Sequence, residues 1–403
     1  MKKYSLMILA AALLVAPVAS QAAQFAVFGP RALGMGGASV AAVNDSTAVY
    51  WNPAALADFR KTDIRLSAGA AARDYADLNN KWSDINNIYS AGLAGDPAAA
   101  AQLQQMLLDL DKPDSVTNLD ATGGLLLSIP FARSAMAISA IGVGYAEIIP
   151  TIDTYHLNTS PTATTDSIAL NNSAATGIGL VTVEPAISFA TSLLDDRIFI
   201  GANAKMIYAS TFINTDYLRT GDYNNFIDNL NNSETRSSKA SIDAGILVKP
   251  TKGLNLGVVG RYLNSPSFTV TGIVAEQLGN GDVQKSLLPV TGEIELKPQY
   301  RAGVAWKPID NLTLSADYDL SKNKSFTERT EDQTVAGGVE LTMLKEVLSL
   351  RGGAYKNTAN TNANVVYTVG LGLRLAAFRL DLAGAYDFKE QEAQASASLA
   401  FKF

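Results

Sequence analysis

Apolar and polar residues alternate over the last ten positions of the chain. Ala395, Ala397, Leu399, Phe401 and Phe403 are apolar, and polar residues stand at most of the positions between them. A period of two places successive side chains on opposite faces of an extended strand, so this stretch predicts a strand with one apolar face. In a soluble sheet such a terminal strand would expose an aggregation-prone edge, whereas in a closed membrane barrel its edge is paired. The pattern therefore favours a membrane barrel.

Thirteen further segments alternate in the same way, which predicts an all-β fold, a transmembrane antiparallel barrel of about fourteen strands. These segments lie near residues 64–68, 125–129, 134–147, 183–191, 198–208, 240–248, 254–262, 300–306, 312–320, 335–343, 348–354, 365–375 and 378–388. Short turns alternate with long polar connections, among them residues 74–120 and 264–296. Short periplasmic turns, long outer loops and an even strand count are typical of bacterial outer-membrane barrels. A soluble β-sandwich is the alternative, but it is not expected to sort its loops by length.

Charged residues stand on the polar face of these predicted strands. An Arg or Lys on the lipid face near the membrane midplane would cost about 2–4 kcal/mol, so the charged face is expected to line the lumen. The two signs are mixed, which predicts ion pairs across the lumen or to a plug. The charged residues are Arg65, Lys205, Asp243, Arg261, Arg301, Asp317, Glu340, Arg351, Arg374 and Asp381, and the polar Asn203 stands on the same face.

The chain divides into three predicted units. Residues 1–22 have a basic start, a short apolar core and small residues at the end, as in a secretory signal peptide. Residues 23–61 are rich in glycine and small residues and barely periodic, and we expect them to form a hatch that fills the lumen. Residues 62–403 form the barrel. A barrel of fourteen strands is wider than those filled by their own side chains, so it needs such a plug.

The first long loop predicts two short amphipathic helices. Asp96 can cap a helix with Pro97 at its first position. Apolar residues then recur at helical spacing here and in the segment before it. The two helices form an apolar groove on the outer side, or they pack on each other as a lid. The candidate groove residues are Trp82, Ile85, Leu103, Met106, Leu107 and Leu110.

Composition excludes several kinds of chemistry. The chain has no cysteine and one histidine, His156, which lies in a polar loop without a second histidine nearby. We therefore expect no metal site, no cofactor and no catalytic residues, and hence not an enzyme. The net charge of −6 argues against nucleic acid as a partner.

The segment from Arg31 to Ala38, followed by Asn44-Asp45 and by Asn52 to Leu56, resembles the start of the FadL-like outer-membrane proteins. Phe403 and the two Lys-Pro turns at 249–250 and 307–308 extend the resemblance. It implies that the N-terminal segment is a hatch inside the barrel and that the mature amino terminus lines an inner ligand pocket. The residues that it assigns to hatch and pocket are Phe25, Phe28, Asn52, Pro53 and Ala54.

The glycine-rich motif also resembles a subgroup of these barrels that carries the conjugal-transfer label TraF. The helical loop pair departs from the transporters, which place their apolar groove in later loops. The leading hypothesis is a monomeric barrel in the bacterial outer membrane, in contact with its lipid. It would take up a hydrophobic small molecule such as a long-chain fatty acid or a hydrocarbon. The alternative is a non-transporting component of a conjugation or secretion apparatus. A general porin ranks third, because the hatch argues against it.

Overall fold

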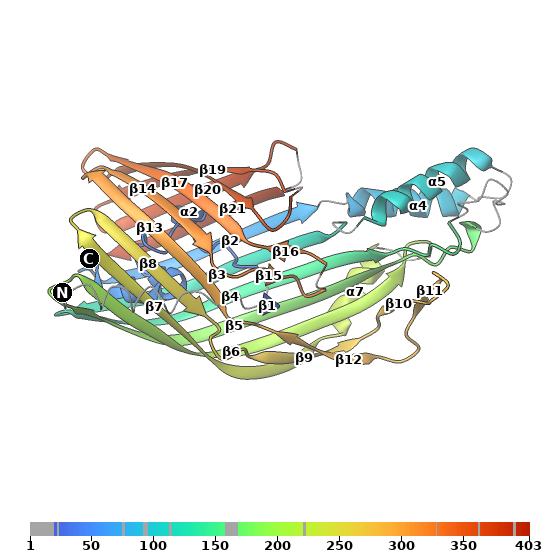
Figure 1. Ribbon diagram of the computed structural model, residues 1–403, viewed down its shortest axis with the longest axis horizontal. Coiled ribbons are helices and arrows are strands. Elements are labelled where there is room, and N and C mark those ends of the chain that lie inside the picture. The colour runs from blue at the N-terminus through green and yellow to red at the C-terminus, as the bar shows by residue number, and fades with distance from the viewer. Residues whose placement is uncertain are drawn as a thin grey trace, which may run out of the picture.

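The computed structural model describes residues 20–21, 24–74, 77–91, 96–112, 115–157, 168–220, 223–327, 329–361, 363–389 and 392–403. The predicted signal peptide lies outside this part of the chain except for Ser20 and Gln21. Most of the described chain is one closed barrel (Figure 1). The outer loops project from one end of the barrel, and the C-terminus lies at the opposite end, among the short turns.

The barrel has fourteen strands, each antiparallel to its neighbours, as the alternation predicts. They are β2 (Asp63–Asp74), β3 (Thr117–Phe131), β4 (Ser134–Thr151), β5 (Ala174–Leu193), β6 (Ile198–Tyr217), β7 (Thr235–Thr251), β8 (Leu254–Arg261), β13 (Gln299–Ile309), β14 (Leu312–Asp319), β17 (Thr334–Met343), β18 (Leu348–Asn357), β19 (Val366–Leu375), β20 (Phe378–Tyr386) and β21 (Glu392–Lys402). The last strand pairs with the first, from Asp63 opposite Lys402 to Arg73 opposite Glu392. The backbones of Thr62 and Phe403 exchange two further hydrogen bonds of 2.9 and 3.0 Å, so the terminal strand has no free edge.

The two faces of the wall separate as predicted. Outward side chains are exposed and apolar, with Ile138 62% and Val369 69% exposed, whereas inward Arg65 and Arg351 are only 2% and 5% exposed. An apolar exterior around a charged, enclosed interior is the surface of a barrel that spans a membrane. No helix in the described part of the chain is long and apolar enough to cross one.

The outer ends of the barrel differ from the sequence prediction. Strands β5 and β6 each have 20 residues and reach well into the segments expected to be loops. The connection 264–296 contains two hairpins, β9 (Ser267–Gly272) with β12 (Val290–Glu295) and β10 (Ala275–Gln277) with β11 (Val283–Lys285). Residues 223–232 form helix α7 (Tyr223–Asn232). The sequence analysis treated these segments as polar loops, and they pack on the ends of the long strands.

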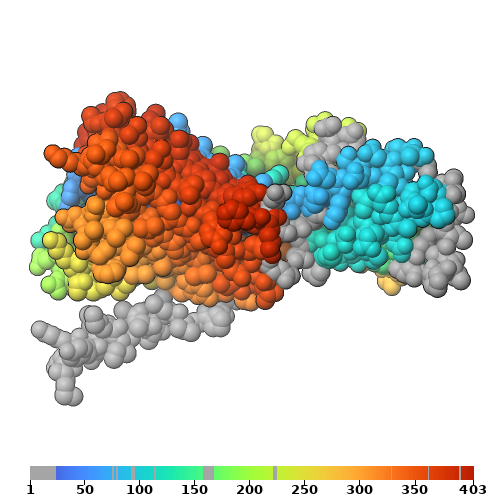
Figure 2. Space-filling view, turned by 90° about the horizontal axis from the view of Figure 1, so that it is seen from above, coloured from blue at the N-terminus to red at the C-terminus, as the bar shows by residue number. Residues whose placement is uncertain are grey.

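Two of the outer-loop helices agree with the prediction. Helix α4 (Leu78–Ala91) and helix α5 (Pro97–Leu110) pack side by side. The Asp96 carboxylate accepts hydrogen bonds from the amides of Ala98 and Ala99, which caps α5. Figure 2 shows both helices projecting beyond one end of the barrel. A small three-stranded sheet, β1 (Ser20–Gln21), β15 (Asn323–Lys324) and β16 (Glu331–Asp332), lies near the same end.

The segment ahead of β2 forms the hatch inside the lumen, as predicted. It contains helix α2 (Pro30–Gly34), helix α3 (Ala48–Trp51) and the 3₁₀ turn η1 (Pro53–Ala57), and every residue of these three elements is buried. Helix α2 packs on β18–β21, and η1 packs on β3–β7. The main apolar core of the protein therefore lies between the hatch and the barrel wall. The exact unit boundaries at 22/23 and 61/62 stay a prediction.

Candidate functional site

Four aromatic rings form the centre of the hatch. Phe25 stacks on Trp51 at 5.5 Å between ring centroids, and Phe28 stacks on Tyr50 at 5.1 Å. The Trp51 indole donates a 2.8 Å hydrogen bond to the carbonyl of Phe28. The Arg261 guanidinium of the barrel wall lies 3.8 Å from the Tyr50 ring, a cation–π contact. Phe25 and Phe28 thus contact the hatch's own rings, and their role in ligand binding stays a prediction.

The Asn52-Pro53-Ala54 segment fixes the hatch to the opposite wall. The Asn52 amide nitrogen donates to the carbonyls of Val40 and Ile246, at 3.2 and 3.1 Å, and its oxygen accepts from the amide of Ala54. The barrel wall has a glycine, Gly201, where this segment approaches it. A Cβ at this position would stand 2.5 Å from the carbonyl carbon of Pro53, too close for a side chain. The three residues that the resemblance assigns to the hatch therefore lie in it, while a contact with ligand stays a prediction.

Buried ion pairs hold the other side of the hatch, as the mixed charges predict. Arg31 of α2 pairs with Glu340 at 2.8 Å, and Arg351 reaches the same carboxylate at 2.6 Å. Arg351 also lies 2.8 Å from Asp381. Beside them, Arg65 bridges Asp45 of the hatch and Asp63 of the wall, both at 3.2 Å. Because these side chains are almost fully buried, breaking one pair would leave an uncompensated charge in the interior.

A second charged cluster lies on the wall next to the aromatic centre. The Lys205 ammonium is 2.9 Å from Glu184 and 3.1 Å from Asp243. The Tyr262 hydroxyl donates a 2.9 Å hydrogen bond to Glu184, and its ring lies 3.9 Å below the Lys205 ammonium. Every charge of this cluster has a partner of opposite sign, so the cluster serves to stabilise the filled lumen.

The candidate groove residues of the first loop come together in one apolar cluster. Trp82, Ile85, Leu103, Leu107 and Leu110 are 0–2% exposed. Trp82 packs edge-on against Phe226 of α7, 5.1 Å away, and Met106 lies at the border of the cluster. The side chains thus fill the space between α4, α5 and α7, which matches the lid alternative. An apolar groove that accepts a ligand stays a prediction.

Two cavities lie on opposite sides of the same part of the wall. The inner cavity, about 20 Å³, is bounded by hatch residues from Gln24 to Leu33, by strands β2 and β21, and by Asp120 and Thr122 of β3. On the membrane side, a hollow of about 910 Å³ is lined mainly by alanine, glycine and leucine of β2 and β18–β21. The lining residues that both cavities share are Gly69, Ala70, Ala395 and Ser396. A single layer of small residues therefore separates the inner cavity from the hollow.

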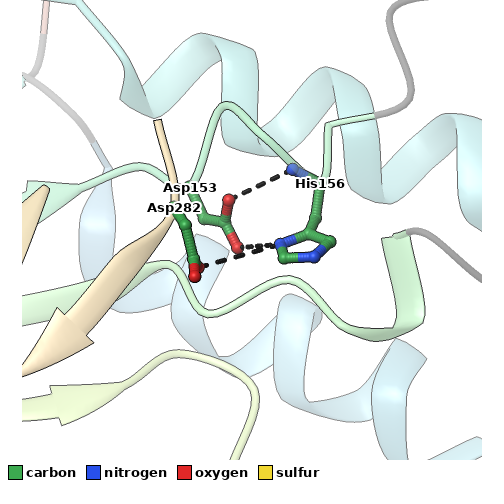
Figure 3. A group of neighbouring side chains, drawn as sticks. All are labelled: Asp153, His156 and Asp282. Atoms are coloured by element: carbon green, nitrogen blue, oxygen red, sulfur yellow. Dashed lines mark hydrogen bonds and ion pairs between the residues drawn. The ribbon is translucent and has the colours of Figure 1, made fainter. Parts of the chain in front are cut away.

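The sequence analysis missed a cluster around His156. Its Nδ1 lies 2.7 Å from Oδ2 of Asp153 and 3.9 Å from Oδ1 of Asp282 (Figure 3). Asp282 lies in the β10–β11 turn, so no local sequence signal could have paired it with His156. The three ligand atoms lie within 4.8 Å of one another and could hold a metal ion. The buried Asp153 carboxylate, however, already accepts hydrogen bonds from the amides of His156 and Asn172, which lie with it in the β4–β5 connection. These bonds explain the cluster without a metal ion.

A closed fourteen-strand barrel with an apolar exterior, a charged lumen and a hatch fixed inside it defines a plugged membrane barrel. The sequence profile of the family described as "F plasmid transfer operon, TraF, protein" matches residues 49–319, and the chain belongs to this family. No curated protein matches the sequence.

Solved structures share the fold over nearly the whole chain. The Ralstonia pickettii toluene transporter TbuX is 13% identical with a TM-score of 0.55, over 94% of this chain and 98% of that one. The Pseudomonas putida toluene transporter TodX is 11% identical with a TM-score of 0.53, over 93% and 98%. A Pseudomonas aeruginosa FadL homologue is 13% identical with a TM-score of 0.53, over 96% and 99%. The protein is thus a FadL-like barrel in fold.

Proposed function

We propose that the protein is a monomeric barrel of the bacterial outer membrane that takes up a small hydrophobic molecule, of the long-chain fatty acid or hydrocarbon class. The fold that it shares with two toluene transporters and a FadL homologue supports this proposal. The apolar exterior and the long loops on one side support the membrane and its orientation. The proposal includes no catalytic step, because the molecule would pass through the barrel chemically unchanged.

The observation that carries the proposal is the pair of cavities at Gly69–Ala70 and Ala395–Ser396. The hatch closes the straight path through the lumen, so an apolar molecule that reaches the inner cavity has the membrane as its nearest apolar surroundings. The inner cavity holds only about 20 Å³, so a ring or an acyl chain enters it after neighbouring side chains move. The hollow is lined mainly by apolar side chains, so an apolar ring or chain that leaves through the wall stays out of water, which makes the wall the low-cost exit.

Uptake by proteoliposomes that contain the full-length protein tests this. Radiolabelled toluene and palmitate are the probes. In the variants Ala70→Trp and Ala395→Trp, the larger side chain fills the hollow at the wall. Both changes should lower the uptake rate at least ten-fold, whereas Ala204→Trp, at an outward position on β6, should leave it unchanged. Absence of uptake by the unaltered protein, or equal loss in all three variants, would contradict the proposal.

A second function, a non-transporting role in a conjugation or secretion apparatus, has support of its own. The hatch is fixed by buried ion pairs on one wall and by the Asn52 segment on the other, which suits a barrel that stays closed. The family description supports the same role. Conjugation frequency in a deletion strain, with and without the restored gene, tests it: a loss that the Ala70→Trp variant fully restores would favour this role over uptake.

A further inference from the structure

The end of the barrel with the short turns, where the C-terminus lies (Figure 1), has a hollow of about 400 Å³ against the hatch. Hatch residues Ala42, Val43 and Asn44 form one side of it, and the β5–β6 turn, the β7–β8 turn and the end of β13 form the other. The wall residues Ala305 and Thr313, which also line it, face the lumen and are 3% and 5% exposed. The hollow therefore opens inside the rim of the barrel, away from the surrounding lipid.

Cations outnumber carboxylates in the lining of this hollow. Both carboxylates have a partner, because Asp58 pairs with Lys249, and Asp196 lies 3.0 Å from Arg60. The remaining cations of the lining are Arg197, Lys252 and Lys307. None of these three side chains makes an ion pair or a hydrogen bond within the part of the chain that the structure describes. The hollow thus holds positive charge without a counter-charge, although the chain as a whole has a net charge of −6.

A second hollow, of about 350 Å³, adjoins the first, since Asn44, Lys307 and Thr313 line both. Its lining adds Lys61, for which the described residues likewise offer no ion-pair partner. The carboxylates of this lining, apart from Asp310, are paired with arginine. The two hollows together form one basic trough, in which unpaired positive charge is in excess.

The charges of the basic trough are suited to attract an anionic partner. Like charges gathered in a hollow repel one another, and low-dielectric walls focus their field toward an incoming group of opposite sign. A partner that brings carboxylates would relieve this repulsion and accept charge-assisted hydrogen bonds. Complementary charge of this kind contributes mostly to the rate and the specificity of association.

Three features favour an acidic peptide over other anions. The basic trough extends over two adjoining hollows, which is more than a small anion such as phosphate needs. Lipid headgroups meet the outside of the wall and not the inside of its rim. Among its lining residues the first hollow has no aromatic ring on which the bases of a nucleic acid could stack. The carboxylates of Asp58, Asp196 and Asp310 would also repel a polyphosphate, whereas a peptide can offer both signs of charge.

We propose that the basic trough is a docking site for an acidic segment of a soluble protein, whose carboxylates would lie against Arg197, Lys252 and Lys307. In the membrane orientation proposed above, this protein is on the periplasmic side, and for that location alone the inference rests on the proposed function. The contact involves neither the apolar cavities of the wall nor the passage of a hydrophobic molecule.

Fluorescence anisotropy of a fluorescein-labelled octaglutamate peptide tests this docking site. The sample is the full chain, purified from cells in the uncharged detergent dodecyl maltoside, and labelled octalysine is the probe of opposite charge. We expect saturable binding of octaglutamate alone, weakened at least five-fold by Lys307→Gln, because this side chain lines both hollows. Lys345→Gln removes the same charge from the β17–β18 turn outside the trough and should leave the affinity unchanged. Heat-modifiable mobility on gels verifies that each variant is a folded barrel.

Two competitors separate an acidic segment from other anions. Inorganic phosphate and a single-stranded thymidine octanucleotide are added at the same total charge, and each should displace the peptide at least ten-fold less well than unlabelled octaglutamate. Equal displacement by phosphate would mean a site for small anions, and equal or better displacement by the oligonucleotide would mean a nucleic-acid site. Either result, no peptide binding by the folded barrel, or equal losses in Lys307→Gln and Lys345→Gln overturns the proposal. Uptake by proteoliposomes is a separate measurement, so the failure of one proposal is distinguishable from the failure of the other.

Discussion

The guanidinium of Arg31 donates hydrogen bonds of 3.0 and 2.8 Å to the two oxygens of the Glu340 carboxylate, a residue 309 positions further along the chain. This bidentate contact joins the hatch to strand β17 in the middle of the lumen. Two parallel charge-assisted bonds fix orientation as well as distance, so helix α2 can neither rotate nor slide along the wall while the pair is intact.

Arg31→Met should loosen the hatch, because it leaves Glu340 buried with only Arg351 as a partner. Removing one member of a buried pair costs about 3–5 kcal/mol, and we expect a loss of that order in the free energy of unfolding. Denaturant titration followed by tryptophan fluorescence measures it, since Trp51 lies in the hatch. Arg60→Met, which breaks an exposed pair with Asp196, should cause no measurable change. Equal effects of the two changes would refute the interpretation.

Gly201→Ala should displace the hatch from the wall, because the new Cβ would stand 2.5 Å from Pro53 backbone. Overpacking of this kind costs about 1–3 kcal/mol. Single-channel conductance in planar bilayers should rise from the closed level of the unaltered protein, and the unfolding midpoint should fall. Gly352→Ala is the matched control, since its Cβ would meet no atom within 4 Å. A closed, fully stable Gly201→Ala barrel would show that the contact is unimportant.

Asp332 should make stability depend on pH. Burial raises its pKa in the folded protein to about 6, above the ordinary 3.8, so the folded state holds the proton more tightly than the unfolded chain. The stabilisation is present at low pH and is lost as the pH rises from about 4 through 6. Asp332→Asn should thus match the unaltered protein at pH 4 and exceed it in unfolding midpoint at pH 8. A difference that is the same at both pH values would rule out this carboxyl group.

His156→Gln should loosen the β4–β5 connection, because Asp153 in the same connection is the hydrogen-bond partner of the ring. The lost hydrogen bond contributes about 1 kcal/mol, a local effect that leaves the barrel intact. Hydrogen exchange followed by mass spectrometry should show faster exchange in residues 152–157 and 168–173 and unchanged exchange in the hatch. Asp282→Asn, whose carboxylate lies 3.9 Å from the ring, should have a smaller effect. The reverse order of the two variants would mean that Asp282 is the main partner.

The barrel wall could be predicted from sequence because lipid on one side and the charged lumen on the other impose a period of two. The outer half of β5 could not be predicted, because this difference between the two faces is missing there. Its first seven residues are all buried, because α7 covers the face that would otherwise be exposed, and Phe226 packs against Gly177. Without a difference between the faces, no alternation marks the strand.

The hatch could be placed in the lumen from its glycines and from its resemblance to known barrels, but its attachments could not. Whether Arg31 meets Glu340 or another lumen carboxylate depends on barrel register and on the path of the hatch, which no local pattern encodes. The ion pairs of Arg73 with Asp120 and Asp332 could not be predicted for a similar reason, since the three residues come from three separate segments.

The contacts of Asn44 and Asp45 lie at the seam where the first and last strands meet. Lys402, in the final strand, donates a 2.9 Å hydrogen bond to the carbonyl of Asn44, and Arg65, in the first strand, bonds Ser398 while it pairs with Asp45. The hatch therefore touches both sides of this seam. Closure of the cylinder and retention of its contents thus depend on the same few side chains.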